Sequence, residues 1–280
     1  MADAPTSARH FATASTATPN TTKPPEKAFG ILPQTLTLHS TTLVNDDTAL
    51  LTFSLPQGSS GSPQVSGLPL TSTLLSLTWP SGSWTPIVRP YTPVSSSSTP
   101  GEIQFLIKKY PGGKVSSHMH SLKPGDTVRF VAVPGAKHVP STNEMKPARV
   151  SMIAGGAGIT PMLQLIRGIL GNPDDYTRIR LLWGVNTPSD AYLMDEFAAL
   201  KLRFPGRFDV RYVVSKADEV QSQTEKGRID GALLAKLRWA PKCSEEKVYV
   251  CGPPGMEESL VGKQGVLIEM GYRKGQVVKF

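Results

Sequence analysis

The segment from Arg149 to Leu170 constrains the fold more than any other part of this 280-residue chain. Its apolar start, Val150 to Ala154, is typical of a buried parallel strand. After a glycine turn, Thr160 and Pro161 stand where a helix N-cap and the first helical residue are expected. The turn glycines are expected to let a phosphate approach the backbone: Gly155, Gly156 and Gly158. Because free N–H groups at a helix start carry partial positive charge, the segment predicts a diphosphate site.

Such a turn can also simply close a strand onto a helix, so its interpretation depends on other patterns in the chain. Two of these are RPYTPVS, from Arg89 to Ser95, and YVCGPPGM, from Tyr249 to Met256. The length of the chain is sufficient for two domains, each with its own core. Hydrophobic residues make up 39% and charged residues 19%, as in soluble globular proteins.

Charge and cysteine content exclude several classes of protein. Two cysteines are too few for a disulfide framework. A run of about 18 apolar residues, as a membrane span requires, does not occur in the sequence. The net charge of +8 is dispersed and lacks an aromatic–basic repeat, so nucleic-acid binding is not expected. The basic surface favours an acidic protein or an anionic cofactor as partner.

Residues 1–29 are rich in Ala, Thr, Ser and Pro and are expected to form a disordered tail. Within this tail, Ala8 to Ser15 (ARHFATAS) resembles the end of a mitochondrial presequence, being basic, rich in hydroxyls and free of acids. The alternative is a low-complexity linker. The first interpretation predicts a mitochondrial or membrane-associated protein through a missing N-terminal segment, although the chain itself is expected to be soluble.

Residues 30–145 show short alternating strands separated by turn-forming residues, and this spacing predicts a six-stranded antiparallel β-barrel domain. A short helix, Ser116–Leu122, is expected directly after Gly112 and Gly113. The predicted strands are Gln34–Ser40, Ala49–Leu55, Leu74–Trp79, Pro86–Tyr91, Glu102–Lys109 and Thr127–Val133.

Residues 146–280 alternate strands with helices, which is the pattern of an α/β domain with a parallel sheet covered on both faces. The domain boundary is expected within Pro134–Pro147. Ligand phosphates in such sheets gather at the carboxyl ends of the strands. The predicted strands are Val150–Ala154, Ile179–Gly184, Phe208–Val214, Val248–Cys251 and Gln276–Phe280; the predicted helices are Pro161–Leu170, Ser189–Phe204, Gly231–Trp239 and Gln264–Met270.

Four motifs occur in an order and spacing that resemble the NADH–cytochrome b5 reductase family, which belongs to the ferredoxin-reductase-like flavoproteins: RPYTPVS, IKKYPGGKVSSHM, GGAGITPM and CGPPGM. The resemblance covers about Gly30 to Phe280, and the ending GYRKGQVVKF is most similar to the mitochondrial fungal-type branch. It implies FAD as cofactor, a hydride from NADH (with NADPH as an alternative), and single electrons passed to cytochrome b5 or a related acidic haem protein.

Two other functions are alternatives to this reading. One is a reductase component for another one-electron acceptor, of the nitrate reductase or oxygenase type. The other is a non-catalytic nucleotide-binding module on the same fold.

In the barrel, the resemblance assigns roles to the RPYTPVS motif. It implies that Arg89 holds the FAD diphosphate, that Tyr91 packs on the isoalloxazine, and that Thr92 hydrogen-bonds near flavin N5, with Pro90 between them. Without the other motifs, this segment reads as an edge strand whose prolines resist aggregation.

The second motif is expected to close over the FAD diphosphate through Tyr110, Gly112, Gly113, Lys114, Val115 and Ser116. On the preceding strand, the resemblance gives Ile107 backbone contacts to the flavin and directs Lys108 toward the nicotinamide nucleotide. The alternative for Lys108 is a solvated edge lysine. His118 and His120 lack spaced Cys or acidic partners, so we expect no metal site.

In the α/β domain, the resemblance places Cys251 near nicotinamide C4, as an orienting group and not a nucleophile. Gly252, Pro253 and Met256 complete this loop and, with the glycine turn, Thr160 and Pro161, form the expected nucleotide site. The residues expected to act most directly in catalysis are Tyr91, Thr92, Lys108 and Cys251.

The chain departs from the family pattern at two places. NADH-preferring members usually carry an acid at the end of the third strand of this domain, where this chain has Ser215 and Lys216. A hydroxyl beside a cation could accept the 2′-phosphate of NADPH, so the preference for NADH is in question. The segment TSTLLSLTW also replaces a Gly-Gln-His type turn, which affects details of hydrogen bonding inside the barrel.

Overall fold

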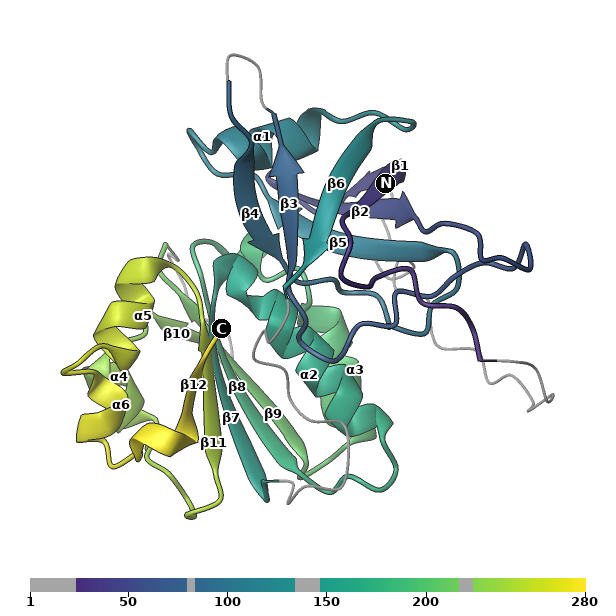
Figure 1. Cartoon of the computed structure of the whole chain (residues 1–280). Coiled ribbons are helices and arrows are strands. Elements are labelled where there is room, and N and C mark those ends of the chain that lie inside the picture. The colour runs from purple at the N-terminus through teal and green to yellow at the C-terminus, as the bar shows by residue number, and fades with distance from the viewer. Residues whose placement is uncertain (1–23, 80–83, 134–146, 217–223) are drawn as a thin grey trace, which may run out of the picture.

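The computed structural model describes residues 24–79, 84–133, 147–216 and 224–280. Its two sheets form two bodies stacked one above the other, each with its own helices (Figure 1). The first is an antiparallel six-stranded half-barrel in the order β4-β3-β6-β1-β2-β5, as predicted. Its strands are β1 (Gln34–Leu43), β2 (Thr48–Ser54), β3 (Leu74–Thr78), β4 (Ile87–Tyr91), β5 (Glu102–Lys108) and β6 (Thr127–Ala132), and its helix is α1 (Lys114–Ser121).

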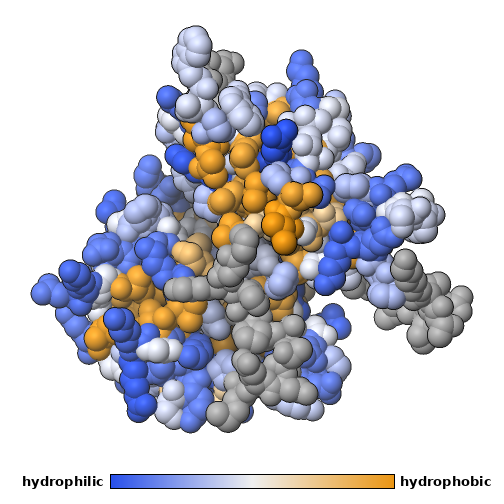
Figure 2. Space-filling view, viewed as in Figure 1, coloured by the Kyte–Doolittle hydropathy of each residue, from blue (hydrophilic) through white to orange (hydrophobic). Residues whose placement is uncertain are grey.

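The barrel core forms on the inward faces of the strands. Phe105 stacks on Phe130 with ring centroids 5.0 Å apart, and Phe53 meets Phe130 edge-on at 5.3 Å. Strand β2 is buried on both faces because its alternate residue Leu50 points away from the barrel and joins the core of the second domain. On the outside of β3, β4 and β6, Figure 2 shows apolar side chains at the surface, where Val88 is 40% exposed.

The second sheet is parallel, in the order β10-β9-β8-β7-β11-β12. In Figure 1, α2 and α3 cover one face and α4, α5 and α6 the other. The strands are β7 (Arg149–Gly155), β8 (Arg178–Val185), β9 (Phe208–Val214), β10 (Thr224–Lys226), β11 (Lys247–Cys251) and β12 (Val277–Lys279). The helices are α2 (Ile159–Gly171), α3 (Met194–Arg203), α4 (Gly231–Lys236), α5 (Pro254–Val261) and α6 (Val266–Glu269), with 3₁₀ turns η1 (Gly156–Gly158), η2 (Pro188–Asp190) and η3 (Lys274–Gln276).

Successive side chains of each strand point to opposite faces of this sheet, so a separate core forms on each face. Met152 of β7 and Leu181 of β8 pack with α2, whereas their neighbours Ile153 and Leu182 pack with α4, α5 and α6. The covering of both sheet faces, which the alternation of strands with helices predicted, is therefore confirmed by the two layers of helices.

Several boundaries differ from the sequence-based prediction. The expected helix Ser189–Phe204 is broken into η2 and α3, because Thr187 and Asp190 cap a separate short turn. Strand β10 is a three-residue edge strand that carried no periodic signal. Ala28 and Phe29, which were expected in the disordered tail, are instead buried in the barrel core. The possible presequence Ala8–Ser15 and most of the predicted domain boundary lie outside the described residues.

Candidate cofactor site between the two domains

The edge strands of the barrel sheet are β4 and β5, and helix α1 packs against both. Arg89 and Tyr91 of β4, Lys108 of β5 and the start of α1 therefore lie around one side of the barrel. Arg89 is exposed and donates from Nη1 to the Val88 carbonyl at 2.9 Å. Tyr91 is half-buried, edge-on to Phe105, and burial raises its pKa to about 12, so its hydroxyl stays protonated. Pro90 is exposed and Thr92, just after β4, is half-buried.

Helix α1 begins at Lys114 and not at Ser116 as expected. Its N-cap is Gly113, without a side-chain hydrogen bond, so the first N–H groups carry no side-chain cap. Gly112 has a φ of +72° and open space where a Cβ would stand. These features fit a diphosphate bound by the helix start.

Ser116 and Val115 of this segment are both held within the barrel domain. The Ser116 hydroxyl donates to the Gly113 carbonyl at 3.2 Å and accepts from the Tyr110 N–H at 3.2 Å, which fixes the turn itself. Val115 is buried in the barrel core and can offer a cofactor only its backbone. Ile107 is also buried there, and its carbonyl lies 2.8 Å from Nε2 of His120, so the barrel backbone holds this histidine ring.

Lys108 is neither solvated nor free to reach outward, because its side chain is only 11% exposed. Its ammonium lies 2.8 Å from an oxygen of Asp47 and also pairs with Asp190 of the second domain. Burial lowers the pKa of Lys108, but the hydrogen bonds to the two carboxylates outweigh it and raise the pKa above its ordinary value. Burial likewise acts against ionised Asp190, yet its hydrogen bond with Lys108 keeps the pKa of Asp190 below its usual range.

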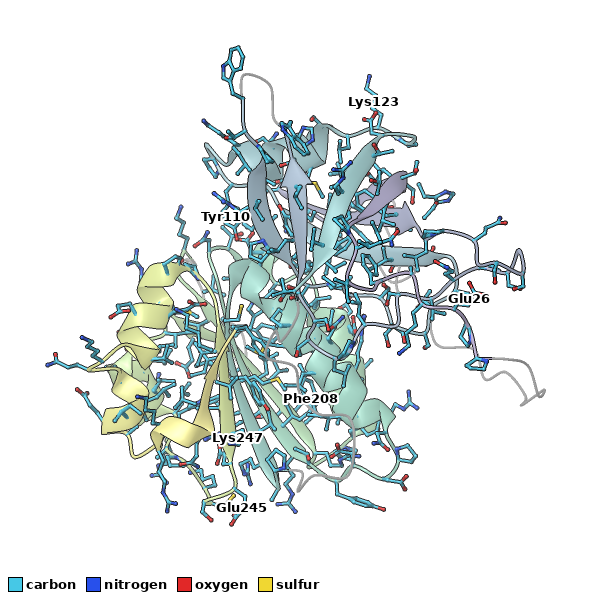
Figure 3. The ribbon with its side chains drawn as sticks, in the orientation of Figure 1. Glu26, Tyr110, Lys123, Phe208, Glu245 and Lys247 are labelled. Atoms are coloured by element: carbon cyan, nitrogen blue, oxygen red, sulfur yellow. The ribbon has the colours of Figure 1, made fainter. Side chains whose placement is uncertain are left out.

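Tyr110 connects the barrel to the glycine turn. Its hydroxyl lies against this turn, close to the Ala157 backbone and 3.8 Å from the position that a Cβ on Gly156 would occupy. Figure 3 shows Tyr110 at the junction of the two domains, whereas Glu245 and Lys247 lie at the far end of the parallel sheet. The two segments that the sequence assigned to FAD and to the nicotinamide nucleotide therefore meet at one interface.

Each of the three turn positions favours glycine for a different physical reason. Gly156 has a φ of +52°, which favours glycine. A Cβ on Gly158 would stand 2.2 Å from the Cys251 carbonyl oxygen, and one on Gly155 would stand 2.8 Å from the Met256 sulfur. Gly155 and Gly158 thus allow the turn to pack against the CGPPGM loop. That the three glycines clear space for a phosphate stays a prediction.

The helix start also differs from the prediction. The N-cap of α2 is Gly158, and Thr160 lies within the first turn, where its hydroxyl donates to the Ala157 carbonyl at 3.2 Å. Thr160 is therefore not the cap, because η1 leads directly into the helix and supplies the preceding turn. Pro161 is the third helical residue; its missing N–H still removes no intrahelical bond. As in α1, the N-cap residue of α2 makes no side-chain hydrogen bond to the N-terminal N–H groups.

Cys251 ends β11 beside this turn. Burial raises the pKa of its thiol to about 12, which keeps it neutral and agrees with an orienting role. Pro253 is the N-cap of α5, and the Gly252 N–H donates to a Glu257 carboxylate oxygen at 3.0 Å. The buried Glu257 was not among the predicted site residues, although an acid in the first turn of a helix is a recognisable signal.

Ser215 and Lys216 directly follow β9, at the same carboxyl edge as the glycine turn. The Ser215 hydroxyl lies 3.4 Å from the Asn186 side-chain oxygen, and Lys216 is exposed while its N–H donates to the Asn186 carbonyl at 2.7 Å. Their location at the sheet edge is as expected. Their effect on cofactor preference stays a prediction.

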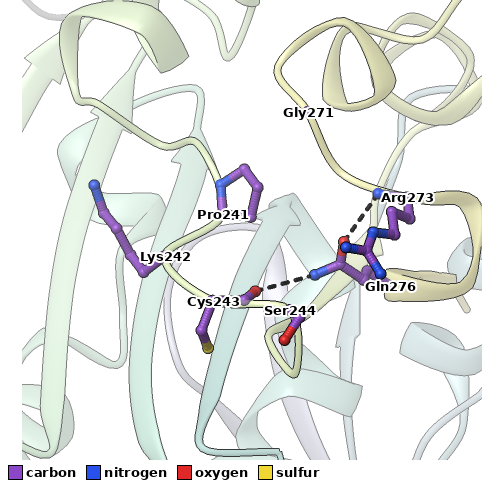
Figure 4. Close-up of a pocket in the computed structure, with 7 residues that line it drawn as sticks. All are labelled: Pro241, Lys242, Cys243, Ser244, Gly271, Arg273 and Gln276. Atoms are coloured by element: carbon purple, nitrogen blue, oxygen red, sulfur yellow. Dashed lines mark hydrogen bonds between the residues drawn. The ribbon is translucent and has the colours of Figure 1, made fainter.

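Within the described part of the chain, no group of three or more His, Cys, Asp or Glu side chains could hold a metal ion. A hollow of about 220 Å³, lined by Cys243, Ser244, Arg273, Gln276 and their neighbours, lies beside the start of β11 (Figure 4). This hollow is at the opposite end of the sheet from the glycine turn. No helix built from the described residues is long and apolar enough to cross a membrane.

Comparison with known proteins agrees with this two-domain site. Residues 35–137 match the oxidoreductase FAD-binding domain, and residues 152–261 match the oxidoreductase NAD-binding domain. NADH-cytochrome b5 reductase 2 of Pyricularia oryzae is 39% identical over 255 residues, covering 88% of this chain and 75% of that protein. The Botryotinia fuckeliana protein of the same name is 40% identical, with 88% and 71% covered. The chain belongs to the NADH–cytochrome b5 reductase family.

Solved structures extend the comparison of this reductase family member to three dimensions. The cytochrome b5 reductase domain of Ulva prolifera nitrate reductase superposes with a TM-score of 0.77 at 28% identity, covering 91% of this chain and all of that domain. The CS-b5R domains of human Ncb5or give 0.73 at 24% identity, with 90% and 70% covered, which supports the fold alone. The half-barrel thus lies within the FAD-binding domain and the glycine turn within the NAD-binding domain, as the resemblance implied.

Proposed function

We propose that this reductase takes a hydride from NADH and delivers single electrons to cytochrome b5 or a similar acidic haem protein. The observation that carries the proposal is the contact of Tyr110 with the backbone of the glycine turn at Ala157. It joins the FAD-binding barrel to the nucleotide-binding edge, and hydride transfer requires the two reacting rings to be in contact.

The residues present suit this arrangement. Arg89 and the uncapped start of α1 would hold the FAD diphosphate, while the Tyr91 ring and the Thr92 hydroxyl would face the isoalloxazine. When bound, FAD supplies a hydride acceptor that can release electrons singly. The neutral Cys251 thiol and the start of α2 would orient the nicotinamide nucleotide, and neither has to transfer a proton.

The acceptor and the location are supported by the sequence and by the names of relatives. The net charge of +8 favours an acidic partner, and the fungal relatives are named as cytochrome b5 reductases. The segment Ala8–Ser15 supports a mitochondrial location. Ser215 and Lys216 support the use of NADPH as a second donor.

Stopped-flow absorbance with NADH and with NADPH, followed by mixing with cytochrome b5, tests the proposal. We expect a yellow protein that NADH bleaches and that then reduces cytochrome b5. Bleaching by NADH without transfer to cytochrome b5 would instead indicate a reductase for another one-electron acceptor. A protein that stays colourless after reconstitution with FAD would indicate a non-catalytic nucleotide-binding module.

A further inference from the structure

Two polar side chains of the barrel bond to one short turn of the nucleotide-binding domain. The turn is η2, which follows the carboxyl end of β8. Asn45, in the turn between β1 and β2, donates from its side chain to the Ser189 carbonyl at 2.9 Å. Lys108 of β5 donates to the Asp190 carboxylate. Asn45 is itself fixed, because its side-chain oxygen accepts the Thr48 N–H at 2.8 Å.

The two carboxylate oxygens of Asp190 accept hydrogen bonds from different domains. One oxygen accepts the Thr187 N–H at 3.0 Å and the Thr187 hydroxyl at 3.1 Å, which closes the η2 turn. The other oxygen accepts from Lys108 across the interface. The side chains of Lys108 and Asp190 are 11% and 12% exposed, so removing one charge leaves the other poorly solvated.

The pair lies close to both cofactor-binding segments. Lys108 is two residues before Tyr110, which contacts the glycine turn. Asp190 follows β8, and β8 pairs with the strand that leads into that turn, with Gly184 opposite Gly155. A change in the Lys108–Asp190 distance would therefore change how the barrel approaches the nucleotide edge.

We infer that Asp190 is a positioning residue for hydride transfer, acting through Lys108 to set the approach of the FAD-binding barrel to the nucleotide-binding domain. This inference rests on the proposed function. A misplacement of about 1 Å can slow a transfer of this kind by about 100-fold, so a contact remote from the reacting atoms can control the rate.

Asp47 provides a matched control, because it bonds to the same ammonium from within the barrel. Its oxygen lies 2.8 Å from the Lys108 nitrogen. Asp47→Asn and Asp190→Asn each remove one of the two carboxylates that pair with Lys108, but only Asp190→Asn breaks a contact between the domains. In Asp190→Asn the remaining side-chain oxygen can still cap Thr187, so the η2 turn is preserved.

The test measures flavin reduction by NADH in the FAD-loaded protein. We expect Asp190→Asn to lower the limiting reduction rate about tenfold, with the Kd for NADH and for FAD within about twofold of wild type. Asp47→Asn should lower the rate less than about threefold. In a Lys108→Met background, adding Asp190→Asn should change the rate no further, because the partner through which Asp190 acts is already gone.

A second readout does not depend on activity. Amide hydrogen exchange of the unliganded protein should accelerate at both 45–48 and 187–190 in Asp190→Asn, and only at 45–48 in Asp47→Asn. Equal rate losses in the two variants would overturn the inference, as would an additional loss in the Lys108→Met background. If wild-type protein loaded with FAD is not reduced by NADH, the proposed function fails, whereas the exchange pattern still tests the link between domains.

Discussion

Arg89 presents an exposed guanidinium at the edge of β4, beside the uncapped start of α1. Arg89→Ala should weaken FAD binding, because a charge-assisted hydrogen bond worth about 1.5–3 kcal/mol is removed. Fluorescence titration of the apoprotein with FAD measures this loss. Arg129→Ala, at an exposed position on β6 of the same barrel, is the control and should bind FAD as wild type does. Retention of FAD by Arg89→Ala through dialysis, as tightly as by wild type, would remove Arg89 from the site.

Cys251 is a neutral thiol, because burial raises its pKa to about 12. Cys251→Ser should leave the FAD spectrum unchanged and slow flavin reduction, since it alters nicotinamide placement. The wild-type reduction rate should show no titration of this thiol between about pH 7 and 9. Stopped-flow reduction measures both effects, with Cys243→Ser as the control in the distant hollow. A wild-type rate in Cys251→Ser would leave the glycine turn as the supported contact to the nicotinamide nucleotide.

Ser215 stands at the end of β9, where an acid would disfavour the 2′-phosphate of NADPH. We expect wild type to prefer NADH, because an exposed pair with Lys216 is worth only about 0–1 kcal/mol. Ser215→Asp should sharpen this preference, mainly by raising the Michaelis constant for NADPH. Steady-state kinetics with both cofactors measure the ratio. If wild type already rejects NADPH as strongly as Ser215→Asp does, discrimination lies elsewhere in the protein.

At the scale of elements, the turn between β7 and α2 depends on its contact with the loop after β11. Gly158→Ala should destabilise the protein by more than about 2 kcal/mol, because its Cβ would meet the Cys251 carbonyl oxygen at 2.2 Å. Gly171→Ala, at the other end of α2 with nothing within 4 Å of the new Cβ, should be neutral or stabilising. Urea unfolding of both variants measures the difference. Similar stabilities would show that the turn can move away from Cys251.

Element positions were well predicted wherever a local pattern determined them. Strand β9 begins at Phe208 and ends at Val214 as expected, because alternation and flanking turn residues define it. Helix α4 begins at Gly231 as expected, capped by Asp230, whose side chain accepts the Leu233 N–H. The helix cap at Thr160 was wrong because the chain forms a 3₁₀ turn first, and only the packing against Cys251 requires that turn.

The site could be predicted only where a motif is continuous in sequence. The glycine turn and the RPYTPVS and CGPPGM motifs pointed to segments that the structure places around the interface of the two domains. Lys108 and Asp190 are 82 residues apart, and neither sequence position shows that the other is its partner. Asp47 and Asn45 read as ordinary turn residues, and only the docking of two domains gives them a second contact.

At the scale of the whole molecule, the two domains share a buried core. Leu50 and Leu106 of the barrel belong to the same buried cluster as the residues of α2. Thr71, with a φ of 63°, donates its N–H to the Gln164 side chain of α2 at 2.7 Å. A Cβ on Gly168 of α2 would stand 2.6 Å from the Leu70 side chain, so this helix lies directly against the barrel.

Arg167 of α2 contributes to the same interface with a charged side chain. It donates to the Val94 carbonyl of the barrel at 2.7 Å and makes two hydrogen bonds, of 2.7 and 2.9 Å, to the Glu196 carboxylate of α3. Because Arg167→Ala leaves Glu196 without this partner and removes a link between domains, we expect a loss of about 2–4 kcal/mol in the free energy of unfolding.

The control for Arg167→Ala is Lys201→Ala, which removes a pair with Asp209 on the surface of the nucleotide-binding domain. Such a pair contributes about 0–1 kcal/mol, so this variant should unfold almost as wild type does. Calorimetry should also show a broader transition in Arg167→Ala than in Lys201→Ala, because weaker coupling lets the barrel and the parallel sheet unfold at different temperatures. Transitions of equal width and midpoint would show that Arg167 does not contribute measurably to the coupling of the two domains.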